Sequence, residues 1–176
     1  MLTEDTGTQG KGRYELELGM QQLREGDARA FAFGPQFSGG VLDGLDLIVR
    51  PVWLDLRGPD ASARGIGDTA LDGKWRFFDE GPLSFGLRAG LDLPTGHEGK
   101  GLGTGEVGYH GVLIATYAME FLSFSANLGV LHVGNIPLQR RDLVLASVGA
   151  AWVAREGLQL TAEVAAASNP DPDRST

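Results

Sequence analysis

The stretch "TALDGKWRFFDEGPLSFGLRAGLDL", residues 69–93, alternates apolar with polar or small residues on both sides of the turn "DEGP". Its apolar positions include Leu71, Trp75, Phe77, Leu83, Phe85, Leu87 and Leu91. Its charged positions include Asp72, Lys74, Arg76, Arg88 and Asp92. Successive side chains of a strand point to opposite faces, so this period of two predicts an antiparallel hairpin with one apolar and one charged face. If Phe77 pairs with Leu83, Asp72 lies directly opposite Arg88.

The same alternation recurs along most of the chain. We expect strands near residues 13–21, 30–37, 45–56, 68–77, 83–93, 106–116, 122–130, 143–153 and 158–166. Pro51 within the third segment indicates a bulge or a change of facing, because proline has no N–H to donate to a ladder. The alanine-rich segment "LTAEVAAAS" favours a helix by composition, but its period is two. About nine strands and no helix predict an all-β antiparallel fold.

A glycine-rich segment, "GKGLGTGEVGYHG" at residues 99–111, contains the pattern G-x-G-x-x-G at Gly103, Gly105 and Gly108. In a dinucleotide-binding fold, these glycines follow a strand and open a helix. Here the turn cluster "PTGHE" precedes them, and a segment with a period of two follows. The segment is therefore predicted to be a long loop that enters a strand, and not a nucleotide site.

The connections between the expected strands alternate in length. The short connections "SGGVLDG", "DEGP", "YAME" and "AREG" alternate with longer ones such as "RGPDASARGIG", "PTGHEGKGLGTG" and "HVGNIPLQRRD". Threading the strands up and down places most aromatic side chains near the short turns: Tyr14, Phe37, Trp75, Phe77, Phe85, Tyr117, Phe124 and Trp152. This asymmetry and an aromatic girdle at one interface are typical of bacterial outer-membrane β-barrels.

The composition is compatible with such a barrel and argues against other classes. The 176 residues include 27 glycines and no cysteine, and the formal net charge is −8. An acidic chain argues against nucleic acid as a partner. The lack of cysteine excludes disulfides and thiolate metal sites. No run of 18 apolar residues is present, which excludes a spanning helix but not spanning strands, because such strands are only half apolar.

Eight charged side chains lie on the polar faces of the expected strands: Glu15, Glu17, Asp72, Lys74, Arg76, Arg88, Asp92 and Glu163. In a transmembrane barrel they line the lumen and act on small-molecule solutes, while the opposite leucines face outer-membrane lipid. In the alternative, a soluble β-barrel that binds a small apolar ligand, the same charged side chains face solvent. The two accounts differ in which face of the sheet is wet. The sequence sets no oligomeric state.

Catalytic and metal sites have no sequence signature here. The three histidines, His97, His110 and His132, have none of the spacings that bind zinc, and no G-x-S-x-G is present. Ser123, Ser125 and Ser147 are better explained as small lumen residues than as nucleophiles. We therefore expect no enzyme activity, no cofactor and no metal.

Three stretches of the chain also resemble a known family. They are "LTEDTGTQGKGRYELELG" near the N-terminus, "GDTALDGKWRFF" in the middle and "LDLPTGHEGKGLGTGEVGY" in the long loop. Together they resemble the MetA-pathway phenol degradation family, a group of outer-membrane barrels associated with the meta-cleavage pathway as transporters. The resemblance extends from Leu2 to about Pro170. It implies a bacterial outer-membrane channel or transporter for small molecules, with aromatic or hydrophobic compounds as candidate solutes.

The chain divides into three expected parts. These are a polar segment at residues 1–12, a β-barrel domain at 13–167 and a C-terminal loop or tail at 168–176. No signal peptide is evident, whereas members of the family generally carry one, together with further strands after the "NPDP" region. An odd strand count also leaves edges unpaired, because single-chain bacterial barrels use even numbers. We therefore expect an incomplete barrel with free edges near Arg13 and Ala167.

Overall fold

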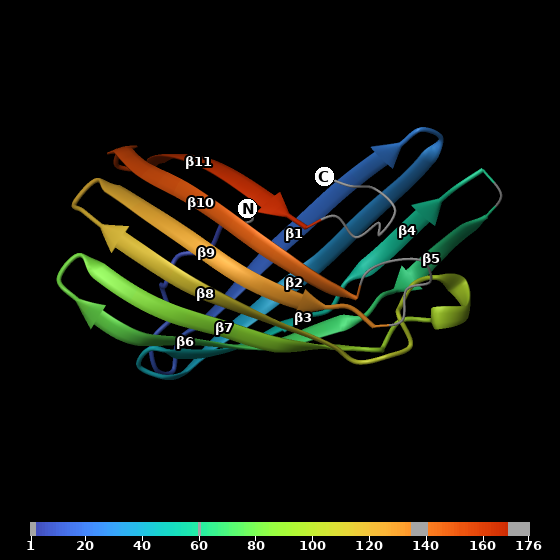
Figure 1. Ribbon diagram of the computed structural model, residues 1–176, viewed down its shortest axis with the longest axis horizontal. Coiled ribbons are helices and arrows are strands. Elements are labelled where there is room, and N and C mark those ends of the chain that lie inside the picture. The colour runs from blue at the N-terminus through green and yellow to red at the C-terminus, as the bar shows by residue number, and fades with distance from the viewer. Residues whose placement is uncertain (1–2, 60, 135–140, 169–176) are drawn as a thin grey trace.

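The computed structural model describes residues 3–59, 61–134 and 141–168, which are almost entirely β (Figure 1). The strands are β1 (Tyr14–Glu25), β2 (Ala28–Leu42), β3 (Leu45–Arg50), β4 (Trp53–Arg57), β5 (Ser62–Ile66), β6 (Thr69–Glu80), β7 (Leu83–Leu93), β8 (Gly108–Ala118), β9 (Leu122–His132), β10 (Asp142–Arg155) and β11 (Leu158–Ala167). A short 3-10 helix, η1 (Glu98–Lys100), lies between β7 and β8. No helix in these ranges is long and apolar enough to cross a membrane. The predicted all-β antiparallel fold is confirmed.

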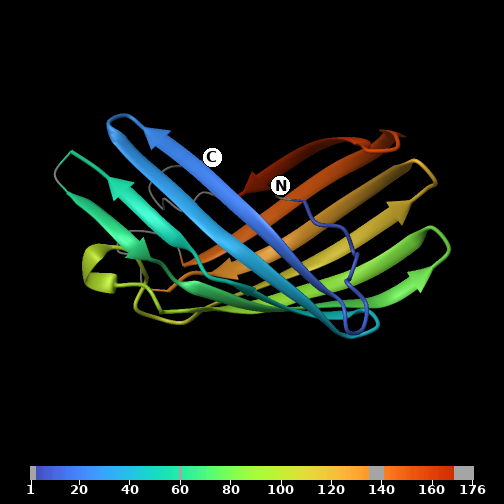
Figure 2. The same cartoon turned by 180° about the vertical axis from the view of Figure 1, so that it is seen from behind.

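All the strands belong to one sheet that curls into an open half-barrel (Figures 1 and 2). The order runs from β11 through β10, β9, β8, β7 and β6 to β3 and β2. β1 pairs with one edge of β2, and β3 and then β4 pair with its other edge. Among the described residues, no ladder joins β1 to β11. The expectation of an incomplete barrel with free edges at β1 and β11 is therefore confirmed. In the described part of the chain, β5 leaves a further free edge, because it pairs only with β4.

A break at Pro51 divides the strand that was expected at residues 45–56. β3 pairs with β6, whereas β4, after the break, pairs with β5. Residues 62–66 were expected in a long connection but form β5, so the described chain has eleven strands and not about nine. The sequence of β5, Ser-Ala-Arg-Gly-Ile, has too few large apolar residues for its period to stand out.

The β6–β7 hairpin has a different register from the expected one. Asp72 pairs with Gly90, and Lys74 pairs with Arg88. The turn is shorter than "DEGP", since Glu80 pairs with Leu83 and the positive φ of Gly81, 59°, suits a two-residue turn. A register irregularity between Arg76 and Phe78 follows. The expectation that Asp72 stands directly opposite Arg88 was therefore wrong.

The two faces of the sheet have opposite chemistry. One face carries exposed large apolar side chains, and it includes Leu16, Leu18, Leu71, Leu91, Leu113, Leu128, Val148 and Leu160. The other face carries buried polar side chains, and it includes Ser38, Asp46, Asp72, Ser84, Arg88, Thr116, Asn127 and Ser147. On β9, for example, Leu128 is 57% exposed and the adjacent Asn127 is 8% exposed. This is the reverse of a soluble protein, in which the apolar face is buried.

Aromatic side chains gather near the short turns. Tyr117 pairs with Phe124 beside the β8–β9 turn, and both rings are exposed. Trp75 and Phe77 are also exposed, with ring centroids 5.6 Å apart, close to the β6–β7 turn. Trp152 is exposed near the β10–β11 turn. These side chains lie at one end of the sheet, on the apolar face.

The remaining sequence predictions fall on the loops and the ends. β8 begins at Gly108 with no helix after the glycine pattern, and Asp68 accepts hydrogen bonds from the backbone N–H groups of Gly96 (2.9 Å) and Thr104 (2.8 Å) within that loop. The glycines therefore belong to a structured loop. The predicted tail at residues 168–176 lies outside the described residues except for Ser168, and residues 135–140 of the last long connection also lie outside them.

Candidate lumen site

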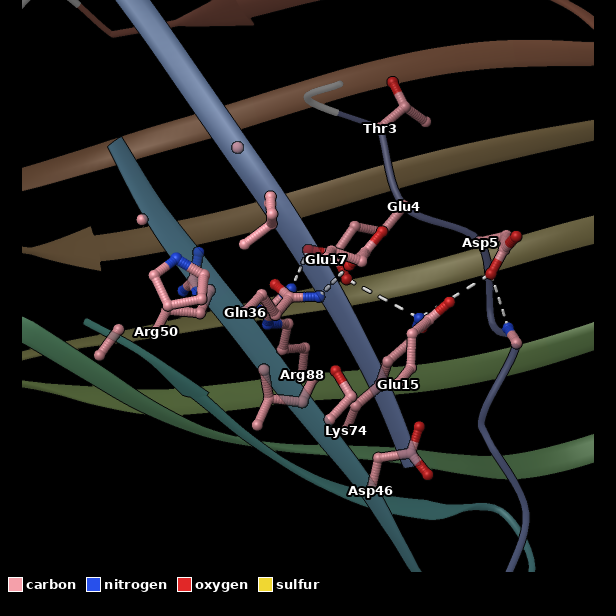
Figure 3. Close-up of a pocket in the computed structure, with 18 of the residues that line it drawn as sticks. Thr3, Glu4, Asp5, Glu15, Glu17, Gln36, Asp46, Arg50, Lys74 and Arg88 are labelled. Carbon is pink, nitrogen blue, oxygen red and sulfur yellow. Dashed lines mark hydrogen bonds and ion pairs between the residues drawn. The ribbon is translucent and has the colours of Figure 1, made fainter. Parts of the chain in front are cut away.

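The polar face of the open half-barrel borders a hollow of about 1330 Å³. Residues of β1, β2, β3, β6, β7, β9, β10 and β11 line it, together with residues of the N-terminal segment, which we define as residues 3–12 (Figure 3). The lining side chains that are labelled in Figure 3 include Glu4, Glu15, Glu17, Arg50, Lys74 and Arg88. The hollow therefore has mixed charge and is suited to water and polar solutes.

Asp72 on β6 is the centre of the charge cluster on this wall, and its side chain is fully buried. Its Oδ2 accepts hydrogen bonds from Arg88 Nη2 at 2.6 Å and from Arg50 Nε at 3.1 Å. Its Oδ1 lies 2.6 Å from His110 Nε2, and His110 Nδ1 lies 3.1 Å from Asp92 Oδ2. A buried carboxylate is stable only when it is paired and hydrogen-bonded, and Asp72 meets both conditions.

Arg88 also reaches the N-terminal segment. Its guanidinium binds Asp72 through Nε and Nη2 and donates from Nη1 to the Glu4 carboxylate. The side chain of Arg88 is 7% exposed, whereas that of Glu4 is 32% exposed. Lys74 Nζ lies 3.9 Å from Glu4 Oε2 and 3.8 Å from Asp5 Oδ1, which is beyond hydrogen-bond length. Glu4 thus lies between two cations of the wall.

The N-terminal segment crosses the hollow and contacts the strands in reverse order of sequence (Figure 2). The Thr3 N–H donates to Glu163 on β11, and Glu4 exchanges two hydrogen bonds with the Asn127 amide on β9. The Thr6 N–H donates to Thr116 on β8, and its hydroxyl bonds Ser84 on β7. The Gln9 N–H then donates to Asp46 on β3. Lumen side chains therefore satisfy the backbone of this segment.

Glycines in the wall leave room for the segment. A Cβ atom at Gly40 on β2 would collide with the carbonyl of Gly10. At Gly149 on β10, a Cβ would lie 3.2 Å from the Thr3 Cβ, and at Gly86 on β7 it would lie 3.5 Å from Thr6 Cγ2. Close backbone approach is a common reason for glycine within a strand. The wall therefore fits the segment in shape as well as in hydrogen bonding.

The eight residues predicted to line a lumen occupy different places. Lys74, Arg88, Asp92, Glu15 and Glu17 line the hollow, and Asp72 is buried in its wall. Glu15 and Glu17 accept hydrogen bonds from the side chains of Gln9 and Gln36. Glu163 binds the Thr3 N–H at 2.9 Å. Arg76 stands apart near the turn, where its Nη1 lies 3.3 Å from Asp79 Oδ2.

Three members of the cluster were missed at the sequence level: Glu4, Arg50 and His110. The period of β8 could have identified His110, because it alternates with the apolar Tyr109 and shares its face with Thr116. Arg50 precedes the break at Pro51, where the period is lost. Glu4 lies in a segment without periodicity, so only the fold brings it to Arg88. In the described part of the chain, no group of three or more His, Asp or Glu is arranged to hold a metal ion.

Comparison with known families identifies the chain. A family model described as "Putative MetA-pathway of phenol degradation" matches residues 2–167. The chain belongs to this family. In this MetA-pathway family member, the match spans both the half-barrel and the N-terminal segment that lies in its hollow. No curated protein matches the chain.

Proposed function

We propose that this chain forms the wall of an outer-membrane β-barrel that passes small molecules, including aromatic or hydrophobic compounds, without catalysing a reaction. The observation that carries the proposal is the opposite chemistry of the two faces. The outer face exposes apolar side chains such as Leu128, and the inner face buries charge such as Asp72. Strands of 10 to 15 residues, as in β1, β2 and β6 to β11, are long enough to cross a bilayer.

The family match and the aromatic side chains near the short turns support the same proposal. Membrane barrels concentrate aromatic rings at the water interfaces. A soluble barrel for an apolar ligand would need an apolar interior, whereas charged side chains such as Arg88 and Lys74 line this hollow. The free edges of β1 and β11 must be paired within a membrane, because unpaired backbone groups are costly in hydrocarbon. A sealed barrel therefore requires strand partners at these edges, and in vesicles that hold only this chain further copies of the chain must supply them.

The experiment is flotation and efflux with vesicles of bacterial lipid. The chain is refolded into vesicles that hold a small fluorescent solute and a large labelled dextran. We expect the protein to float with the vesicles, to resist extraction at high pH, and to release the small solute but not the dextran. A chain that stays in solution without detergent and leaves the vesicles sealed would contradict the proposal and favour the soluble alternative.

A further inference from the structure

The contact between Glu4 and the wall has the form of a bound ligand. Residues 3 to 9 make no β-ladder, and they are held by side chains such as Asn127 and Thr116. The Glu4 carboxylate accepts a hydrogen bond from Arg88 and lies beside Lys74. Arg–carboxylate contacts are among the stronger and more specific hydrogen bonds in proteins. The segment thus delivers one carboxylate to two cations on the wall.

Charge in the wall shows why this position favours an anion. Three cations of the strands, Arg50, Lys74 and Arg88, lie in this part of the wall. The Asp72 carboxylate contacts Arg50 and Arg88, whereas the carboxylate near Lys74 is that of Glu4. Two other strand carboxylates lie nearby and have partners of their own. Asp46, which pairs with Lys74 between β3 and β6, accepts a hydrogen bond from the Gln9 N–H, and Asp92 is bonded to His110. If the N-terminal segment left the hollow, Arg88 Nη1 would lose the Glu4 carboxylate, and Lys74 would lose the nearby carboxylates of Glu4 and Asp5. Cations that converge in a partly buried hollow attract a carboxylate.

The geometry also indicates that the position is reachable. Glu4, Lys74 and Arg88 all line the hollow of about 1330 Å³, which is larger than the volume of a typical ligand pocket. The Glu4 side chain is 32% exposed, so solvent already touches it. Lys74 does not reach hydrogen-bond distance of either Glu4 or Asp5. A mobile anion could therefore bind Lys74 more closely than the tethered carboxylate does.

We propose that Arg88 and Lys74 form a binding subsite for small organic carboxylates, and that Glu4 occupies it as a tethered stand-in that such a solute displaces. This inference rests on the proposed function and names a substrate class for the hollow. The solute and the N-terminal segment compete, so the apparent affinity for the solute is reduced by the fraction of protein in which Glu4 is bound.

Binding of benzoate to the full chain in detergent micelles tests the subsite, with benzamide as a neutral probe of the same shape. We expect benzoate to bind and benzamide to bind at least about tenfold more weakly. Glu4→Gln removes the tethered carboxylate and should tighten benzoate binding about tenfold. Lys74→Gln should weaken it by a similar factor. Glu17→Gln is the matched control, because it removes the same charge elsewhere in the hollow, and it should change the affinity less than about twofold.

A reversible lock separates displacement from a general charge effect. The Cβ of a residue at position 149 would lie 3.2 Å from the Thr3 Cβ, so a shift of a few tenths of an ångström brings the two Cβ atoms to the spacing of a disulfide. The chain has no cysteine of its own that could compete. The Thr3→Cys, Gly149→Cys variant should lose benzoate binding when it is oxidised and recover it on reduction. Unchanged binding in the oxidised form, or equal effects of Glu4→Gln and Glu17→Gln, would overturn the proposal.

Vesicle efflux distinguishes this failure from failure of the proposed function. If the protein releases a small neutral solute but binds benzoate no better than benzamide, the subsite is refuted and the proposed channel still stands. If benzoate binds with the expected pattern among the variants but the protein neither inserts into vesicles nor releases solute, the channel is refuted and the subsite still stands.

Discussion

Leu128 and Asn127 are neighbours on β9, yet they lie in different environments. Leu128 is 57% exposed on the outer face, and Asn127 is buried on the inner face, where its amide holds the backbone of Glu4. The same division separates Leu71 from Asp72 on β6. In the bilayer that we propose, apolar contact with lipid stabilises the outer face, whereas hydrogen bonds and ion pairs stabilise the inner face. Substitutions on the two faces should differ in cost and in cause.

The largest effect is expected from Asp72→Asn on the inner face. This change leaves Arg50, Arg88 and His110 without the carboxylate that contacts all three. Breaking a buried ion pair by removing one partner costs about 3–5 kcal/mol of the free energy of unfolding. Urea unfolding in detergent micelles measures it. The control Leu71→Met on the outer face should stay within about 0.5 kcal/mol, and equal costs for the two variants would contradict the comparison.

The next largest loss of stability is expected from an arginine at a position on the outer face. Leu128→Arg places a charge where we propose lipid, and it should cost about 2–4 kcal/mol if the position is near the bilayer midplane. Ser123→Arg, on the same strand but lining the hollow, should cost less than about 1 kcal/mol. Unfolding of both variants in lipid vesicles gives the two values. A larger cost for Ser123→Arg would reverse the assignment of the faces.

Adding a single Cβ atom at a glycine tests how closely the N-terminal segment contacts the inner face. Gly40→Ala should destabilise the fold by about 1–3 kcal/mol, because its Cβ collides with the Gly10 carbonyl in the N-terminal segment. Gly73→Ala is the matched control, since a Cβ there would have no neighbour within 4 Å. Thermal unfolding of the two variants in the same detergent tests this. Equal midpoints would show that the segment does not press on the wall.

The smallest effect is expected at the edge of the cluster. Arg76 and Asp79 form an ion pair three residues apart, with 33% and 52% of their side chains exposed. Exposed pairs contribute less than about 1 kcal/mol, so Asp79→Asn should barely change the free energy of unfolding in urea. A loss comparable to that of Asp72→Asn would mean that Arg76 belongs to the buried cluster.

The sequence predicted the strands and their faces because both depend on a local period of two. Most strands, the apolar side chains such as Leu71 and the inward charges such as Asp72 could be read in this way. The period could not predict the short turn at Gly81, which shifts the partner of Asp72 from Arg88 to Gly90. It also could not predict β5. This strand pairs with β4, which begins after the break at Pro51 that separates it from β3.

The candidate site was predictable only in part for a related reason. Arg88 and Lys74 follow the strand period and could be predicted. Glu4 could not, because it precedes Arg88 by more than eighty residues in the sequence. That contact depends on the path of a segment with no period of its own. The hydrogen bonds that fix this path come from Asn127, Thr116 and Ser84, whose types alone do not single them out as partners of a backbone.

The most direct test of the account measures which face touches lipid. The chain has no cysteine, so Leu128→Cys and Ser125→Cys each carry one fluorescent label on the same strand, on opposite faces. The protein is refolded into vesicles whose lipid tails carry a quencher, and a soluble quencher is added in a parallel sample. We expect the lipid quencher to act on the Leu128→Cys label and the soluble quencher to act on the Ser125→Cys label. Soluble quenching of both labels, with no quenching by lipid, would contradict it.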